Sequence, residues 1–187
     1  MYILTSHNIN TFNKLGISEL YSHFRNDFLD INLEIKNNSS SFSIDVKEDE
    51  TCTCPFHSDQ KQERFWHIIT TDKNVNRQNR INPCPNPNEK KRRYDKARAK
   101  RIHWIKPTIE QWQSNSEIQH YYQKRGNKVN LILWNTTKSF LVVIRKLSNS
   151  SDKFLVSSYL VHETEVVRYE NHLKEYKENK PTGLEWF

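Results

Sequence analysis

The 187-residue sequence has only 3 glycines and 6 prolines, the residues that most often punctuate turn-rich β-sandwiches and low-complexity tails. It has no apolar run that approaches the ~18 residues of a membrane-spanning helix. The first residues, MYILTSHNINTFNKLG, lack the basic start and the long apolar stretch of a secretory signal. These absences argue against a sandwich, a membrane protein and a secreted protein, so we expect a compact cytoplasmic domain.

Cysteine is also scarce. The three cysteines are an odd number and do not suggest a disulfide framework. The sequence offers the residue types of a Cys3His zinc site in Cys52, Cys54, His57 and Cys84. However, only one residue separates Cys52 from Cys54, fewer than in a usual zinc knuckle. A glycine-rich phosphate loop, an HExxH motif and a G-x-S-x-G elbow are absent. We therefore expect no metal and no cofactor, with the zinc set as an open alternative.

Positive charge is what the sequence has in excess. It holds 29 Lys and Arg against 22 Asp and Glu, a net charge of +7. The basic residues concentrate in KKRRYDKARAKRIHWIK, residues 90–106, where Asp95 is the only acid. Such a surface attracts polyanions, of which nucleic acid is the commonest soluble one. The alternative is that a low-GC genome simply encodes many lysines.

The pattern of apolar residues predicts a single α+β domain over 1–187. We expect an N-terminal helix and hairpin in 1–46, a loop-rich segment in 47–87, and a helix, a three-stranded meander and a last helix in 88–187. The sheet should be antiparallel, with about four strands and packed helices. In chain order, the predicted elements are a helix (17–30), two strands (31–35 and 42–46), a strand rather than a short helix (63–70), a long helix (88–106), three strands (129–135, 139–147 and 153–161) and a helix (163–179).

Three polar intrusions into apolar segments are the candidates for chemistry. His67 stands in RFWHIITTD, either as a polar core residue or as a proton-transfer group that titrates near neutrality. Arg101 and Arg98 lie on helix faces that should be apolar, where a cation is costly unless it meets an anion, snorkels or pairs with a carboxylate. Ser157, Ser158 and Tyr159 interrupt the strand KFLVSSYLV, to bond a neighbouring backbone or to contact a phosphate.

An imidazole, a fixed cation and hydroxyl donors suit the cleavage of RNA by its own 2′-hydroxyl. That reaction needs a general acid or base, a cation for the charge that develops on the phosphorane, and positioning groups. It needs no metal ion.

The order of five segments resembles the barnase–EndoU–colicin–RelE-like (BECR) ribonucleases, in particular their small phage- and plasmid-encoded members. The segments are YSHFRNDFL, RFWHIIT, KARAKRIHWIKPTIE, SFLVVIRKL and KFLVSSYLVHETEVVRYENHLKEY. The resemblance implies helices on a four-stranded antiparallel sheet whose concave face holds RNA. It also implies metal-independent cleavage to a 2′,3′-cyclic phosphate and a 5′-hydroxyl.

Carried over by position, the resemblance makes His67 the acid or base and Arg101 the stabilising cation. A Thr-Ala-Tyr-like tripeptide of the family falls on Ser157-Ser158-Tyr159, and which serine acts stays open. His162 is a second acid or base, or else a neighbour of a helix cap. The expected substrate-binding residues are Thr70, Arg93, Arg98, Lys100 and Trp104.

The leading hypothesis is an endoribonuclease of toxin or phage-defence type that cleaves tRNA or mRNA, with an acidic antitoxin or immunity protein as its inhibitor. The first alternative is a non-catalytic nucleic-acid-binding module that uses the basic helix 90–106. The second is a small interaction protein built on the zinc set.

Overall fold

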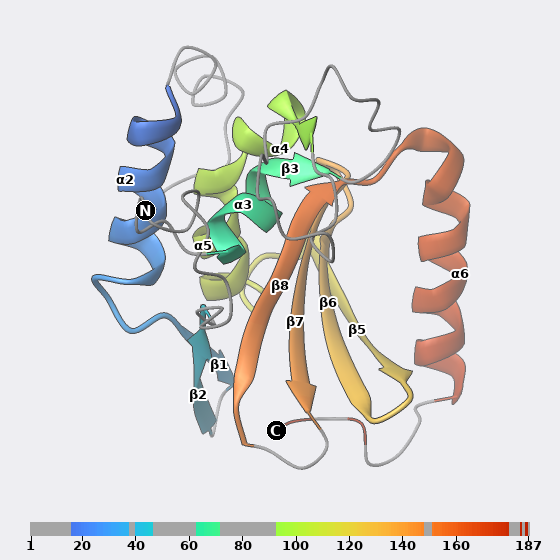
Figure 1. Cartoon of the computed structure of the whole chain (residues 1–187). Helices are drawn as coiled ribbons and strands as arrows, with labels where there is room; N and C mark the ends of the chain where they lie inside the picture. Colours follow the sequence, from blue (N-terminus) through green and yellow to red (C-terminus); the bar gives the residue numbers. More distant parts are fainter. Residues whose placement is uncertain are drawn as a thin grey trace.

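The computed structural model describes residues 16–37, 40–46, 63–71, 93–147 and 151–179, together with 184 and 186. These residues form one α+β domain in which a six-stranded sheet has helices on both faces (Figure 1). The helices are α2 (Ile17–Phe28), α3 (Glu63–Ile69), α4 (Lys96–Ala99), the 3-10 turn η2 (Ile102–Trp104), α5 (Ile105–Glu110) and α6 (Glu163–Asn179). The strands are β1 (Glu34–Asn37), β2 (Ser40–Asp45), β3 (Thr70–Thr71), β4 (Arg93–Tyr94), β5 (Ile118–Arg125), β6 (Lys128–Asn135), β7 (Phe140–Leu147) and β8 (Lys153–Leu160).

The main sheet has the strand order β1-β2-β8-β7-β6-β5. Its neighbours pair antiparallel except β2 and β8, which run parallel with Ile44 opposite Lys153. The three-stranded meander is confirmed as β6, β7 and β8. The expectation of about four antiparallel strands is only roughly met, because the sheet is mixed and has six strands, with the β1–β2 hairpin beside β8 and β5 beside β6. The β5–β6 hairpin closes through a two-residue loop in which Gly126 has φ 59°, a conformation that favours glycine.

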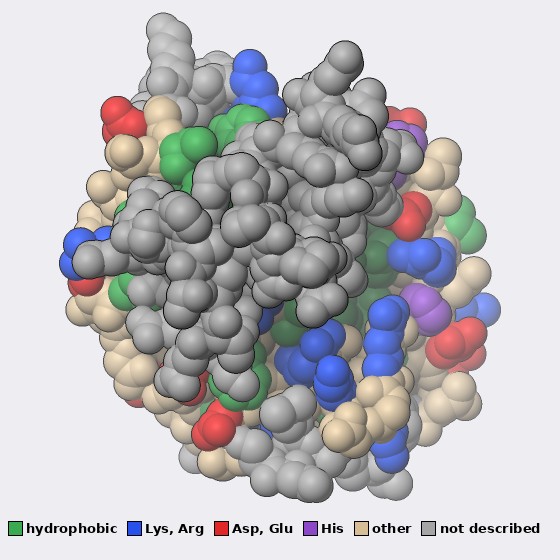
Figure 2. All heavy atoms as spheres, viewed as in Figure 1, with side chains coloured by type: hydrophobic (Ala, Val, Ile, Leu, Met, Phe, Trp, Pro, Cys, Tyr) green, Lys and Arg blue, Asp and Glu red, His purple; other side chains and the backbone are tan. Residues whose placement is uncertain are grey.

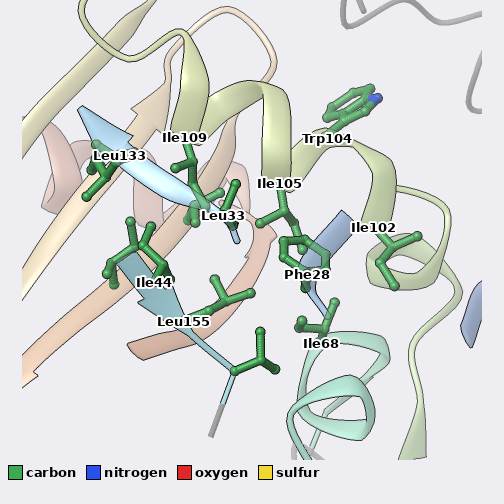
Figure 3. Packing of buried hydrophobic residues seen from close by; sticks show 14 of the residues in the cluster. Phe28, Leu33, Ile44, Ile68, Ile102, Trp104, Ile105, Ile109, Leu133 and Leu155 are labelled. Atoms are coloured by element: carbon green, nitrogen blue, oxygen red, sulfur yellow. The ribbon is translucent and has the colours of Figure 1, made fainter. Parts of the chain in front are cut away.

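The larger core lies between the sheet and the helices α2, α3 and α5. In α2 the residues Leu20, Phe24 and Phe28 recur every four positions, so they form one buried stripe. In Figure 3, Phe28 from α2 is seen between Ile105 from α5 and Ile68 from α3. The predicted N-terminal helix is therefore confirmed, and its stripe anchors this layer.

The smaller core lies on the other face of the sheet, beneath α6. Strand β6 serves both cores, because alternate residues of a strand point to opposite faces. Its Leu131 and Leu133 join the larger core, whereas Ile132 and Trp134 join the smaller one with Tyr169 of α6. A strand buried on both faces reads as a continuous apolar run, which is why VNLILWN has no polar alternation. Within the described residues no helix has both the length and the apolar character to cross a membrane.

Two predicted elements are wrong. Residues 63–69 form the helix α3 instead of a strand. The predicted helix over 88–106 is broken in its described part into β4, α4, η2 and the start of α5. The reason is burial: the four consecutive residues 102–105 are all buried, and one face of an α-helix cannot bury four residues in a row. The chain tightens into a 3-10 turn there, and Pro107 sits in the first turn of α5, where no backbone N–H is needed.

Candidate functional site

A groove runs over the sheet between β8 and α6. It consists of an outer cavity of about 880 Å³ and an inner cavity of about 190 Å³. Both cavities are lined by Arg125, Tyr159, Arg168 and Tyr169, so they are adjacent. Figure 2 shows Lys and Arg side chains gathered in this area, in front of hydrophobic side chains that lie deeper.

The floor of the groove comes from one face of four neighbouring strands. Because side chains alternate along a strand, every second residue of β5 to β7 points to the same side. The floor residues of the inner cavity are Tyr121, Gln123, Arg125, Asn130, Ile132, Val143, Arg145, Val156, Ser157 and Tyr159. Helix α6 adds the wall with Arg168, Tyr169 and His172, which helical spacing brings to one side.

A β-bulge sets which residues of β8 face the groove. Val143 pairs with Ser157 and Ile144 pairs with Leu155, so Val156 is an extra residue. Ser157 therefore lines the inner cavity with Tyr159, as alternation predicted. Simple alternation predicts Leu155 on the same face as Ser157 and Tyr159. Because of the bulge, Leu155 lies on the other face and joins the larger core. Ser158 is 1% exposed and lies on the face opposite Ser157.

Arg98 of α4 ties three elements together at the edge of the groove. Its Nη1 donates to the backbone oxygen of Thr70 at 3.0 Å and contacts the backbone oxygen of His67 at 3.4 Å. Its contact with Ser157 Oγ is 3.5 Å, and Nε lies 3.5 Å from Asp95 Oδ2. Asp95 also caps α4 by accepting from the Arg98 backbone N–H. The cation is thus held in place by the protein itself.

Two tyrosine hydroxyls meet in the middle of the groove. Tyr159 Oη and Tyr169 Oη are 2.8 Å apart, and Arg168 Nη2 donates to Tyr169 Oη at 3.1 Å. Guanidinium groups lie against both rings, Arg98 5.2 Å from the Tyr159 centroid and Arg168 4.9 Å from that of Tyr169. Burial and the hydrogen bond with Tyr169 raise the pKa of Tyr159. The phenol is therefore neutral at pH 7, a hydrogen-bond donor and not a nucleophile.

The excess of positive charge in the groove lies in its inner cavity, whose described lining has Arg125, Arg145 and Arg168 and no Asp or Glu. The described lining of the outer cavity has three arginines, Arg98, Arg125 and Arg168, and three acids, Asp95, Glu163 and Glu165. Asp95 pairs with Arg98, and Glu165 pairs with Arg168 at 3.2 Å. The same hydrogen-bond and charge partners raise the pKa of Arg168, with the Tyr169 bond contributing most. The groove can therefore hold an anion against fixed cations and hydroxyl donors.

The structure brings together only some of the residues predicted from sequence. Tyr159, Arg98 and Ser157 lie at the groove. His67 is a half-buried residue of α3 that lines neither cavity, although its backbone contacts Arg98. Arg101 also lines neither cavity. Its Nη1 donates to the Ala97 backbone oxygen at 2.7 Å, and its guanidinium lies over the Trp104 ring.

The remaining predicted residues lie elsewhere. Trp104 is buried and packs edge-on against Phe140, so it is a core residue and not a base-stacking surface. Thr70 is buried, and its hydroxyl donates to the Trp66 backbone oxygen. Lys100 is the half-buried C-cap of α4. Arg93 is described only through its backbone, which pairs with Thr71.

The alternative zinc set lies outside the described residues. It comprises Cys52, Cys54, Cys84 and His57. Among the residues that are described, no group of three or more His, Cys, Asp or Glu side chains could hold a metal.

Sequence reasoning missed Arg125, Arg145 and Arg168. The first lies on β5, a strand that was not predicted because IQHYYQKR is polar. Its alternation of Tyr121, Gln123 and Arg125 was the available signal. Arg168 carries no signal in the sequence, because an arginine beside the apolar stripe of helix 163–179 is typical of a solvent-facing position.

A scan against protein-family models gives no match for this chain, and neither the curated proteins nor the solved structures contain a similar one at a significant level. The resemblance to BECR ribonucleases therefore stays a prediction, and the functional argument depends on the groove alone.

Proposed function

We propose that the groove binds single-stranded RNA and that the protein is an endoribonuclease that cleaves the bound strand without a metal ion. The observation that carries the proposal is the pair Tyr159–Tyr169, with Arg98 against one ring and Arg168 against the other. Guanidinium groups and phenol hydroxyls are N–H and O–H donors that match the acceptor oxygens of a phosphodiester. Aromatic rings beside arginines also suit unpaired bases.

In this reaction the 2′-oxygen attacks phosphorus and loses its proton to water. The bond to the 5′-oxygen breaks, and that oxygen takes a proton from the solvent. The products are a 2′,3′-cyclic phosphate and a 5′-hydroxyl. Arg168 and the tyrosine pair stabilise the negative charge that builds up on the phosphorane, the contribution that fixed donors make to such transition states. Arg98 is held in place by its contacts with Thr70 and Ser157. Its positive charge beside the Tyr159 ring adds to the stabilisation of the phosphorane.

His162 contributes a third kind of donor. Its Nδ1 accepts the Thr164 backbone N–H at 3.3 Å and lies 2.9 Å from Thr164 Oγ1. In the neutral ring the proton must then be on Nε2. Because His162 lines the outer cavity, this N–H can donate to a phosphate oxygen. His67, in contrast, supports the site through its backbone contact with Arg98.

The test is cleavage of a fluorescent single-stranded RNA in the presence of EDTA, with analysis of the product ends. We expect cyclic phosphate ends from the wild type and a loss of about 10²- to 10³-fold in rate for Arg168→Ala. Tyr159→Phe should also cleave slowly. Arg25→Ala is the matched control, because Arg25 is an exposed arginine of α2 paired with Asp30. Unchanged cleavage by Arg168→Ala would remove the groove as the active site, and activity lost on adding EDTA would remove the metal-independent reaction.

A second candidate is RNA binding without cleavage. It is favoured by one observation: His67, the imidazole expected to transfer protons, lines neither cavity of the groove. The predicted use of a continuous basic helix 90–106 does not apply, since the described part of that helix is broken. A protein of this kind would shift labelled RNA in a salt-dependent way and leave it intact.

A further inference from the structure

The inner cavity of the groove has an unusual set of polar groups. Arg125, Arg145 and Arg168 line it together with the amides of Gln123 and Asn130. None of its described lining residues is Asp or Glu. Three arginines thus line a cavity of about 190 Å³ with no carboxylate on its described wall. Arg145 is half-buried, whereas Arg125 and Arg168 are exposed and Arg168 also pairs with Glu165 outside the cavity lining.

Both amide oxygens in this cavity are already used. Arg145 Nε donates to Asn130 Oδ1 at 2.9 Å, and Arg125 Nε donates to Gln123 Oε1 at 3.0 Å. A guanidinium has no acceptor, so each amide must turn its oxygen toward the arginine and its NH2 away. Apart from the second lone pair of each amide oxygen, these four side chains still present N–H donors. A ligand that offers only acceptors fits them.

Charge selects among such ligands. Arg145 is half-buried, and its burial together with the neighbouring Arg125 lowers its pKa. Both causes disfavour the charged guanidinium, so an anion bound beside it would stabilise it. A base edge with two acceptors, such as that of guanine, would satisfy the donors but not the charge. A phosphate satisfies both, and arginine forks match its oxygens in pairs.

We infer that the inner cavity, which adjoins the Tyr159–Tyr169 centre and shares Arg168 with it, is a phosphate-binding subsite that takes a second phosphate group of the bound nucleic-acid strand. The inference deepens the proposed function and depends on it for the identity of the strand. The phosphate can come from a terminal phosphomonoester or from the next diester of the chain. In either case the subsite makes the protein select strands that extend beyond the phosphodiester bound at the Tyr159–Tyr169 pair.

The experiment is calorimetric titration of the protein with short 2′-O-methyl RNA oligonucleotides, which lack the attacking 2′-hydroxyl. The oligonucleotides carry a 5′-phosphate, a 3′-phosphate or hydroxyl ends. The variants are Arg145→Ala and Asn130→Asp. The second is nearly isosteric and supplies a carboxylate that neutralises Arg145 inside the cavity, so it tests the site even if the alanine variant folds poorly. Melting temperatures confirm that the variants are folded.

We expect both variants to weaken binding by about 10- to 100-fold, the effect of losing a hydrogen bond to a charged group. The slope of log affinity against log salt should fall by about 0.7, the value for one phosphate contact on a single strand. A loss confined to one end-phosphorylated oligonucleotide identifies a terminal phosphate as the occupant. A loss shared by all of them identifies an internal diester. Arg25→Ala should bind like the wild type.

Two results would overturn the subsite: unchanged affinity in both variants, or a loss of affinity that depends on base identity while the salt slope stays unchanged. If the variants lose affinity while the wild type cleaves no RNA, the subsite stands and the nuclease proposal fails. Cleavage by the wild type with unchanged affinity in both variants would remove the subsite alone. A wild type that binds no oligonucleotide would overturn both.

Discussion

Replacing Arg98 by methionine tests whether this arginine holds the groove together from within. Methionine keeps an unbranched apolar stem and removes the guanidinium. Of the three Nη1 contacts, the one to the Thr70 backbone oxygen at 3.0 Å has normal length, while those to His67 and Ser157 at 3.4 and 3.5 Å are long. Loss of a donor to a buried acceptor costs about 1–3 kcal/mol. The partly buried pair with Asp95 adds up to about 1 kcal/mol.

We therefore expect Arg98→Met to lower the free energy of unfolding by about 1–4 kcal/mol. Urea denaturation at pH 7, followed by tryptophan fluorescence, measures this difference. Lys96→Ala is the control, because Lys96 is an exposed residue of the same helix and should change stability by less than about 0.5 kcal/mol. A loss below about 1 kcal/mol for Arg98→Met would refute the reasoning. It would mean that the carbonyl contacts carry little energy and that Arg98 serves only an anion in the groove.

Two further predictions concern the larger core. Burial lowers the pKa of His103 from 6.5 to about 4, with His23 and Arg101 acting in the same direction. The unfolded chain then binds the additional proton between these values, so stability should fall as the pH drops from 6.5 to 4. In His103→Leu, the loss of unfolding free energy over this pH range should be smaller by on the order of 3 kcal/mol. If urea titrations give the same pH dependence for the variant and the wild type, His103 is not a neutral buried ring. Phe24→Ala should cost about 3–5 kcal/mol, since Phe24 is fully buried against Phe28 and Phe65. Val167→Ala, at an exposed position of α6, should change the melting temperature little, and equal losses in the two variants would show that the core is misassigned.

Local patterns predicted the elements whose burial is periodic. The stripe of α2 and the apolar runs of β6, β7 and β8 correspond to predicted segments, and so does α6. The pattern failed where tertiary contacts oppose propensity. Residues 63–69 are rich in strand formers, but Phe65 packs into the larger core against Phe24 and Tyr21, and Arg64 Nη1 donates to the Val156 backbone oxygen. These contacts hold the segment, as a helix, against α2 and β8.

The candidate site was predictable only in part, for a similar reason. Tyr159 and the serines were singled out because polar residues interrupt an apolar strand. The choice of Arg101 over Arg98 assumed one straight helix, and the 3-10 turn after α4 invalidates that assumption. Arg101 instead lies over Trp104, and Arg98 reaches the sheet.

By itself, the sequence determined an excess of cations, an α+β order of elements and the polar residues at the centre of β8. These follow from composition and from periods of two and 3.6 residues, which act over short stretches of chain. Only the tertiary structure decided which cations surround which hydroxyls. The bulge at Val156 puts Leu155 and Ser157 on opposite faces of the sheet. The groove joins side chains from four strands and α6. No local pattern contains such pairings, because they depend on strand register and on the placement of a helix far along the chain.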